Sequence, residues 1–172
     1  IGTRYSGLIS YNKATGEKKL YDKTNTPMKS STINDVVVDK NGIKWVGTDG
    51  DGLYSFDGSS WTQILVDNKI AGPIVRDLYI DPNGTLWMGA FGLYKFDGAT
   101  WTYESTSLFG LPSNSIYSLT MDQSGTLWVA AGSKIATLVG SVWNVYSSGG
   151  SLGLNFTKVN QIHVDDKNQK WF

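Results

Sequence analysis

The chain repeats itself with a period of about forty-two residues, and this period limits the folds open to it. The segment 38–48 reads Val-Asp-Lys-Asn-Gly-Ile-Lys-Trp-Val-Gly-Thr, and related segments follow at 80–90, 121–130 and 164–172. Their tryptophans are separated by 42, 41 and 43 residues and are Trp45, Trp87, Trp128 and Trp171. A period of 40 to 45 residues with several short strands per repeat is typical of β-propeller blades. Helical repeats of this length would need apolar residues at 3.6-residue spacing, which the repeats lack.

Within one repeat we expect four strands, A to D, at 32–38, 43–48, 53–57 and 61–65. The sequence therefore predicts an all-β fold, a β-propeller built of four-stranded antiparallel blades, with about four blades in this chain. Consecutive apolar residues in strand B, such as Trp45-Val46, predict that both faces of each blade are covered and that the repeated tryptophans are buried between blades.

We expect residues 1–172 to form a single propeller domain or fragment. Its predicted parts are a partial blade lacking strand A at 1–22, blades at 32–65, 74–104 and 115–146, and strand A with the start of strand B at 158–172. Two arrangements stay open: a closed four-bladed ring, or a fragment of a larger propeller. We favour the fragment because the chain begins and ends inside predicted strands.

The repeated aspartates are predicted to form turns. Asp39, Asp81, Asp122 and Asp165 each precede a tight A–B hairpin, and an aspartate accepts hydrogen bonds from backbone amides two residues on. Gly42 and its counterparts suit a positive φ, and Asn168 replaces that glycine in the fourth repeat because asparagine tolerates the same conformation. We therefore do not interpret these acids as the carboxylate pair of a glycosidase.

The amino-acid composition limits the classes of partner that we expect for this chain. Lysine and arginine together number 15, as do aspartate and glutamate, so net charge favours neither nucleic acid nor an anionic membrane. No apolar run is long enough to insert into a bilayer.

Cysteine is absent, and His163 is the single histidine, so we predict no catalytic residues, no metal and no cofactor. The segment 49–52 resembles part of a calcium loop, but Ser60 stands where glutamate is required, and a polar B–C hairpin is favoured.

The pattern Asp-x-x-Gly-x-x-Trp-Val-Gly-Thr, followed by Gly-Leu-Tyr-x-Phe-Asp-Gly and a strand beginning Trp-Thr, resembles the two-component-regulator propeller repeat. Asp39 to Trp61 matches almost residue for residue, and Asp81 to Trp101 departs by Ala90 and a shorter B–C turn. The resemblance implies the extracellular or periplasmic sensor of a bacterial hybrid histidine kinase, a non-catalytic module in signal transduction whose ligands are often glycan fragments. The resemblance does not identify binding residues in this chain, because the motif consists of residues that form the propeller scaffold.

Positions that vary between repeats are the candidates for specific binding. The start of strand A and the B–C turns are expected near the central channel, and the D–A connections around its mouth. The predicted ligand-binding residues are Asn34, Arg76, Tyr117, Asn160, Asp35, Asp77, Arg4, Tyr5 and Phe91. Hydrogen-bonding groups beside aromatic rings suit a polar small molecule or oligosaccharide. Two other functions stay open: a propeller enzyme, either lyase or glycosidase, and a protein-interaction or assembly scaffold, with a homodimer or the remaining blades of a larger propeller as partner. Asn155-Phe156-Thr157 also matches a glycosylation acceptor.

Overall fold

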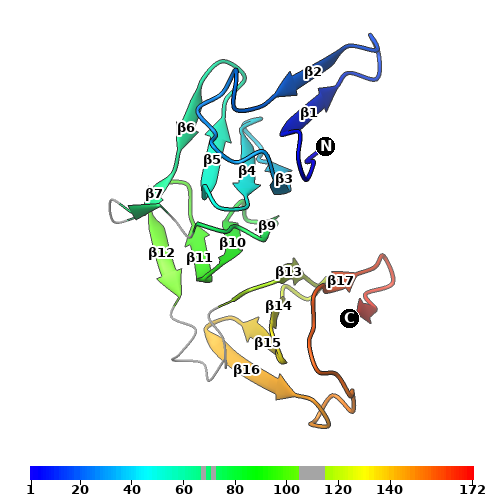
Figure 1. Ribbon diagram of the computed structural model, residues 1–172. Helices are drawn as coiled ribbons and strands as arrows, with labels where there is room; N and C mark the ends of the chain where they lie inside the picture. Colours follow the sequence, from blue (N-terminus) through cyan, green and yellow to red (C-terminus); the bar gives the residue numbers. More distant parts are fainter. Residues whose placement is uncertain (67–68, 71–72, 105–114) are drawn as a thin grey trace. The chain divides into compact units, whose positions relative to one another are not determined.

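The computed structural model describes residues 1–66, 69–70, 73–104 and 115–172 (Figure 1). Every regular element among these residues is a β-strand. None of them forms a helix with the length and apolar composition that crossing a bilayer requires. The chain divides into two compact units, Ile1–Leu78 and Tyr79–Phe172, which are treated in turn. Residues 105–114 of one predicted D–A connection, and parts of another at 67–68 and 71–72, lie outside the described residues.

The first unit contains one complete four-stranded sheet. Its strands follow one another in antiparallel order and are β3 (Ile33–Val38), β4 (Lys44–Thr48), β5 (Leu53–Phe56) and β6 (Trp61–Gln63). Two two-stranded sheets accompany it, formed by β1 (Leu8–Tyr11) with β2 (Lys18–Tyr21) and by β7 (Leu65–Val66) with β8 (Lys69–Ile70). Ahead of β1, Gly2 bridges Leu8 in antiparallel fashion, as a strand B pairs with a strand C.

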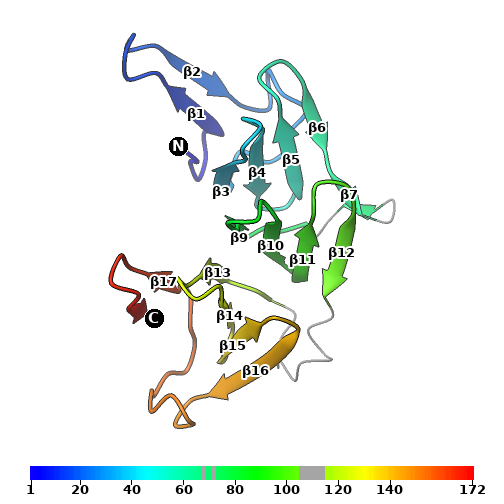
Figure 2. The ribbon, with the colours of Figure 1, turned by 180° about the vertical axis from the view of Figure 1, so that it is seen from behind.

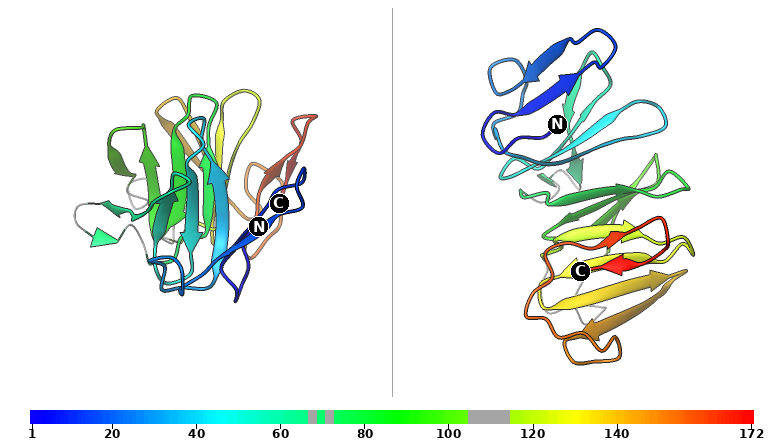
Figure 3. Two further views of the ribbon diagram at one scale, coloured as in Figure 1. Left: turned by 90° about the horizontal axis from the view of Figure 1, so that it is seen from above. Right: turned by 90° about the vertical axis from the view of Figure 1, so that its right-hand side faces the viewer.

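The second unit contains two complete sheets, seen from behind in Figure 2. One sheet comprises β9 (Asp77–Ile80), which spans the boundary between the units, with β10 (Leu86–Ala90), β11 (Gly92–Phe96) and β12 (Trp101–Glu104). The other comprises β13 (Ser118–Met121), β14 (Leu127–Ala131), β15 (Lys134–Val139) and β16 (Val142–Ser147). The short pair β17 (His163–Val164) and β18 (Lys170–Trp171) lies beside β13, at the red end of the ribbon in Figure 3.

These sheets are propeller blades, as predicted: four strands in sequence order, all antiparallel, each joined to the next by a short hairpin. Strand B is the most deeply buried strand of each complete blade, because its neighbours cover both faces. Every residue of β10 is buried, and so are all residues of β4 after Lys44. The strand pattern inferred from the repeat is thus confirmed to within one or two residues at most ends.

The repeated tryptophans are not equally buried. Trp45 and Trp87 are each 6% exposed, and Trp128 is half-buried. Trp171, on β18 of the two-stranded β17–β18 sheet, is 58% exposed. The expectation of burial is confirmed for Trp45 and Trp87.

The A–B hairpins have the predicted turn chemistry. One carboxylate oxygen of Asp39 accepts hydrogen bonds from the backbone N–H groups of Asn41 (2.9 Å) and Ile43 (3.0 Å). Gly42 has φ 79°, and Asn168 at the same place in the fourth repeat has φ 62°, which confirms the interpretation of that substitution. The aspartates of the other repeats make equivalent backbone hydrogen bonds.

The second carboxylate oxygen of each aspartate accepts the indole N–H of the tryptophan six residues on. The donor–acceptor distances are 3.1 Å for Trp45, 3.1 Å for Trp87, 3.0 Å for Trp128 and 2.9 Å for Trp171. In each repeat the aspartate carboxylate therefore has two roles: it accepts the indole N–H of the tryptophan, and it closes the A–B turn. This structural use of the aspartates confirms that they are turn residues.

Successive repeats are joined by a backbone hydrogen bond between the end of one strand B and the start of the next strand A. These bonds run to Thr3 O from Ile33 N, to Thr48 O from Val75 N, to Ala90 O from Ile116 N, and to Gly132 O from Val159 N, at 2.8 to 3.0 Å. The donor residue is always β-branched and at most 5% exposed.

A glycine near the end of strand B makes this close approach possible. A Cβ added to Gly47 would lie 2.6 Å from Val75 Cγ1, and one added to Gly89 would lie 2.7 Å from Ile116 Cγ2. Both distances are shorter than any ordinary carbon–carbon contact. The Val-Gly-Thr sequence of the repeat therefore has a packing reason: the next repeat's side chain sits directly on the glycine backbone.

Candidate functional site

The connection between β16 and β17, drawn in orange in Figure 1, borders a shallow recess. Its first half is a compact set of turns. Gly149 N donates to Leu154 O (2.8 Å), and Gly153 N donates to Gly150 O (2.9 Å). Gly149 and Gly153 have φ of 71° and 68°, which glycine adopts without steric cost. The Ser148 hydroxyl accepts the N–H of Phe156 (2.9 Å), so the two ends of the loop are held together.

This connection borders an open hollow of about 480 Å³, a volume within the size range of small-molecule sites. The hollow is lined by Ser148, Asn155, Phe156, Thr157 and Lys158. These residues offer two hydroxyls, an amide, an ammonium group and an aromatic ring. Phe156 is half-buried and the other four are exposed, so the polar groups face solvent around a partly anchored ring.

The hollow rests on the core of the β13–β16 blade. Phe156 packs against a buried cluster of Ala130, Ile135, Val159 and Ile162, and Tyr117 packs against the same cluster. Lys158 Nζ lies 4.2 Å from the centre of the Tyr117 ring, a cation–π contact. Tyr117 is fixed in turn by its N–H, which donates to Ala130 O at 2.9 Å. The predicted residue Tyr117 therefore adjoins the hollow through Lys158.

The other predicted residues of the second unit are exposed. Asn160 follows Lys158 by two residues in the strand A approach. Phe91 is 45% exposed and forms an isolated bridge with Ser115. Neither lines the hollow. The predicted ligand-binding set does not include the lining residues. The sequence predicts only that the D–A connections surround the channel mouth and that 155–157 matches a glycosylation acceptor.

In the first unit, Asn34 and Asp35 hold the start of β9. Asn34 Nδ2 donates to Val75 O (2.8 Å), and Asp35 accepts the N–H of Leu78 (2.8 Å) and of Val36 (2.8 Å). These bonds bring Asn34 and Asp35 to the segment that carries Arg76 and Asp77. Asn34 lies at a register shift in β3 and is exposed, whereas the other three are half-buried.

Arg4 and Tyr5 occupy the turn that precedes β1. The Arg4 guanidinium lies 5.5 Å from the Tyr5 ring centre, and that ring is 77% exposed. The Arg4 carbonyl accepts the Thr32 hydroxyl. The turn therefore exposes an aromatic ring and a cation to solvent. The hydrogen bond from Thr32, which precedes β3, holds its backbone in place.

Asp51, in the turn expected to be a polar hairpin, is 5% exposed. It accepts hydrogen bonds from the Tyr54 hydroxyl (2.6 Å), from Lys29 N (2.6 Å) and from Gln63 Nε2 (3.3 Å). Burial raises the pKa of Tyr54 well above its ordinary value, and the adjacent carboxylate raises that pKa further. Asp51 is thus a structural acceptor. Within the described ranges no three His, Cys, Asp or Glu side chains are grouped to hold a metal ion.

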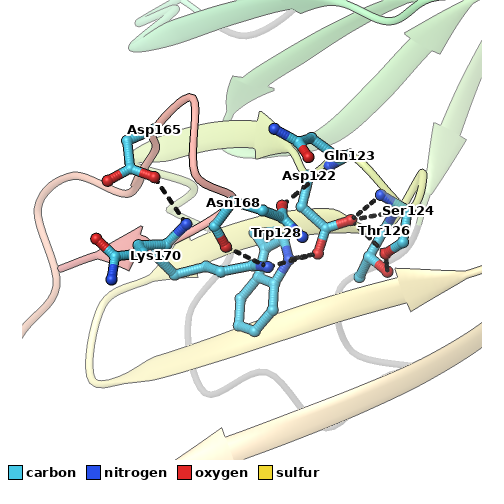
Figure 4. A network of polar contacts seen from close by, with 9 residues as sticks. Asp122, Gln123, Ser124, Thr126, Trp128, Asp165, Asn168 and Lys170 are labelled. Carbon is cyan, nitrogen blue, oxygen red and sulfur yellow. Dashed lines mark hydrogen bonds and ion pairs between the residues drawn. The ribbon is translucent and has the colours of Figure 1, made fainter.

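Figure 4 shows a polar network between the β13–β14 turn and the β17–β18 turn. Lys170 Nζ forms an ion pair with Asp122 (3.0 Å) and donates to Asn168 O (2.9 Å). Gln123 N donates to Asn168 Oδ1 (3.1 Å). Burial would raise the pKa of Asp122, but hydrogen bonds from Ser124, Trp128 and Lys170 outweigh it and hold the pKa well below its usual range. The network joins two successive repeats and keeps Asp122 ionised.

Comparisons with known proteins point to one kind of repeat. The family model described as "Two component regulator propeller" matches residues 68–92 and 110–133, which include the second and third repeated tryptophans. A comparison with curated protein sequences gave no match.

Among solved structures, the chain is similar to the extracellular domain assigned to the hybrid two component system BT3049 from B. thetaiotaomicron. Identity is 25%, the TM-score is 0.79, and the alignment covers 99% of this chain and 23% of that chain. PorZ of Porphyromonas gingivalis aligns with 18% identity and a TM-score of 0.73, over 99% of this chain and 29% of that chain. Virginiamycin B lyase from Staphylococcus aureus aligns with 17% identity and a TM-score of 0.65, over 81% and 48%. The last two likenesses are of fold alone, and the chain spans about a quarter of the extracellular domain.

Proposed function

We propose that this chain, which carries two-component regulator propeller repeats, is part of a non-catalytic sensor that lies outside the cytoplasm and binds a polar small molecule, with glycan fragments as the ligand class. The observation that carries the proposal is the hollow beside Tyr117, where an aromatic ring is surrounded by hydroxyl, amide and ammonium groups. The likeness to an extracellular domain of a hybrid two-component system supports the location.

The chemistry of the hollow fits a sugar. A pyranose has apolar C–H faces that pack on an aromatic ring and hydroxyls at its edge that need both donors and acceptors. Phe156 supplies the ring, Asn155 supplies an amide that donates and accepts, and Ser148 and Thr157 supply hydroxyls. A purely apolar ligand would leave these groups without hydrogen bonds, at a cost in affinity.

The acidic residues of the repeats argue against a hydrolase. The turn aspartates of all four repeats have one oxygen on backbone N–H groups and the other on an indole N–H. A general acid needs a proton and a base needs a free lone pair beside the substrate, and these carboxylates are engaged in their own hairpins. The other predicted ligand-binding residues stay predictions, and they are Asn34, Asp35, Arg76, Asp77, Arg4, Tyr5, Phe91 and Asn160.

Thermal unfolding in the presence of oligosaccharides tests the proposal. A ligand at 100 times its dissociation constant stabilises the folded state by about 2.7 kcal/mol, which raises the Tm of a chain of this size by roughly 5–11 °C. Asn155→Ala should lower that ligand-dependent shift. Asn144→Ala, an exposed asparagine on β16 that does not line the hollow, is the matched control and should keep it. If no oligosaccharide in a panel of neutral and acidic glycans raises the Tm, the proposed ligand class is wrong.

A further inference from the structure

The charges of the chain are unevenly distributed along its sequence. Acidic and basic residues are balanced at 15 each over the whole chain, but the segment 123–164 contains no aspartate or glutamate. Its charged residues are Lys134 and Lys158, with His163 near its end. This segment comprises β14 to β16 and the connection that forms the hollow. The hollow is therefore built from a part of the chain whose formal charge is only positive.

The structure puts one of these charges at the hollow itself. Lys158 lines the hollow, and its Nζ lies over the Tyr117 ring at 4.2 Å from the ring centre. That ring orients the ammonium group and leaves its N–H donors available to an acceptor on the open side, because an aromatic face takes no more than one of three donors. The remaining lining residues are neutral.

The second lysine lies close to the hollow in the sheet. Lys134 pairs with Ser147 in the β15–β16 register, and Ser147 immediately precedes the lining residue Ser148. The acidic residue of this blade, Asp122, lies in the β13–β14 turn and is ion-paired with Lys170. The two lysines are the formally charged residues of β14 to β16 and the connection, so they give the local potential a positive sign although the chain as a whole is neutral.

From this placement we propose that the hollow selects glycans that carry anionic oxygens, with Lys158 as the residue that recognises the anionic group. The proposal rests on the proposed glycan-binding function and narrows its ligand class. Carboxylate and sulfate groups share the required chemistry, which is an oxygen acceptor that forms a charge-assisted hydrogen bond with an ammonium group. Because Lys158 is exposed, the preference for an acidic over a neutral ligand is about two- to fivefold at low salt and weakens as salt screens the charges.

Calorimetric titration of the chain with matched ligand pairs tests this inference. The probes are an oligogalacturonide and its fully methyl-esterified form, in which each carboxylate is replaced by a neutral methyl ester, and a sulfated galactose disaccharide with its desulfated form. The expected result is tighter binding of the charged member by about two- to fivefold at 20 mM salt, with a smaller ratio at 300 mM salt. Comparison of the two ratios shows whether the charge selection is stronger for the carboxylate pair or for the sulfate pair.

Two variants locate the effect. Lys158→Gln should bring the affinity ratio of each pair to about one, whereas Lys167→Gln, an exposed lysine of the same unit that does not line the hollow, should leave the ratio unchanged. Equal binding of charged and neutral members by the unmodified chain would overturn the inference and leave the proposed glycan function intact. Absence of binding by every probe would overturn both.

Discussion

Replacement of Gly47 by alanine should destabilise the first unit through one steric contact. The backbone of Gly47 lies outside the positive-φ region, so alanine meets no conformational strain there. Its new Cβ would lie 2.6 Å from Val75 Cγ1 and 3.1 Å from Val75 Cβ. Because carbon atoms pack at about 3.5–4.0 Å, one of the two strands must move by about 1 Å.

Overpacking of this kind costs about 1–3 kcal/mol. For a chain of this length, that corresponds to a fall in Tm of roughly 2–12 °C. Urea unfolding at constant pH gives the free energy directly, and thermal unfolding gives the Tm. We expect the m-value to stay constant, since the surface exposed on unfolding hardly changes.

A double-mutant cycle with Val75→Ala separates the steric contact from a general intolerance of the strand. Val75→Ala alone loses buried methyl groups and costs about 2 kcal/mol. It also removes the Cγ1 atom that clashes with the new methyl group, so the double variant should be more stable than the sum of the two single changes predicts, by about 0.5–2 kcal/mol.

The third repeat provides the control, because Ala130 occupies the position in that repeat that Gly47 occupies in the first. Ala130→Gly should cost only about 0.5–1 kcal/mol, the ordinary cost of glycine in a strand. Strict additivity of Gly47→Ala and Val75→Ala, or an unchanged stability of Gly47→Ala, would refute the explanation that the repeat has glycine at this position because of packing against Val75.

Three further outcomes are expected. Trp87→Phe removes the indole N–H from the buried Asp81 carboxylate and should lower the free energy of unfolding by about 1.5–3 kcal/mol in urea; an unchanged value would mean that the bond contributes nothing. The pKa of Asp122 is lowered despite burial, so its stabilising effect is present above the unfolded-state pKa and is lost as pH falls through the folded pKa. Lys170→Met should move that loss to higher pH, measured as the urea midpoint from pH 5 to pH 2, and coincident curves would contradict it. Because burial raises the pKa of Tyr54, ultraviolet titration to about pH 11 should show the same number of ionising tyrosines in Tyr54→Phe as in the parent chain; one tyrosine fewer would contradict it.

The fold was largely predictable because its determinants are local and repeated. The turn formed by Asp39 and Gly42 involves residues within four positions of each other, and Asn168 identified the same turn by substitution. The bond between the aspartate and the indole N–H was visible as a constant six-residue spacing, but spacing alone does not tell which way a ring points. Burial of the indole rings is not a local property: Trp45 and Trp87 are 6% exposed within complete blades, whereas Trp171 on the two-stranded β17–β18 sheet is 58% exposed.

The candidate site was less predictable for a physical reason. The hollow is formed by a connection that differs in every repeat, so alignment of the repeats carries no information about Asn155 or Phe156. Alignment also cannot tell a ligand-binding side chain from one that supports the backbone. Asn34 and Asp35 occupy the predicted rows, yet their side chains bond to backbone groups 41 and 43 positions further on.

The backbone contact between successive repeats bears on how repeat proteins of this kind lengthen during evolution. Each copy ends its strand B with a carbonyl and a small residue, and each opens its strand A with an N–H on a β-branched residue. A newly duplicated repeat therefore already has both the acceptor carbonyl and the donor N–H of this contact, and no compensating change is needed in its neighbours. Gene duplication can lengthen such an array in single steps, which leaves the intervening connections free to diverge toward new ligands.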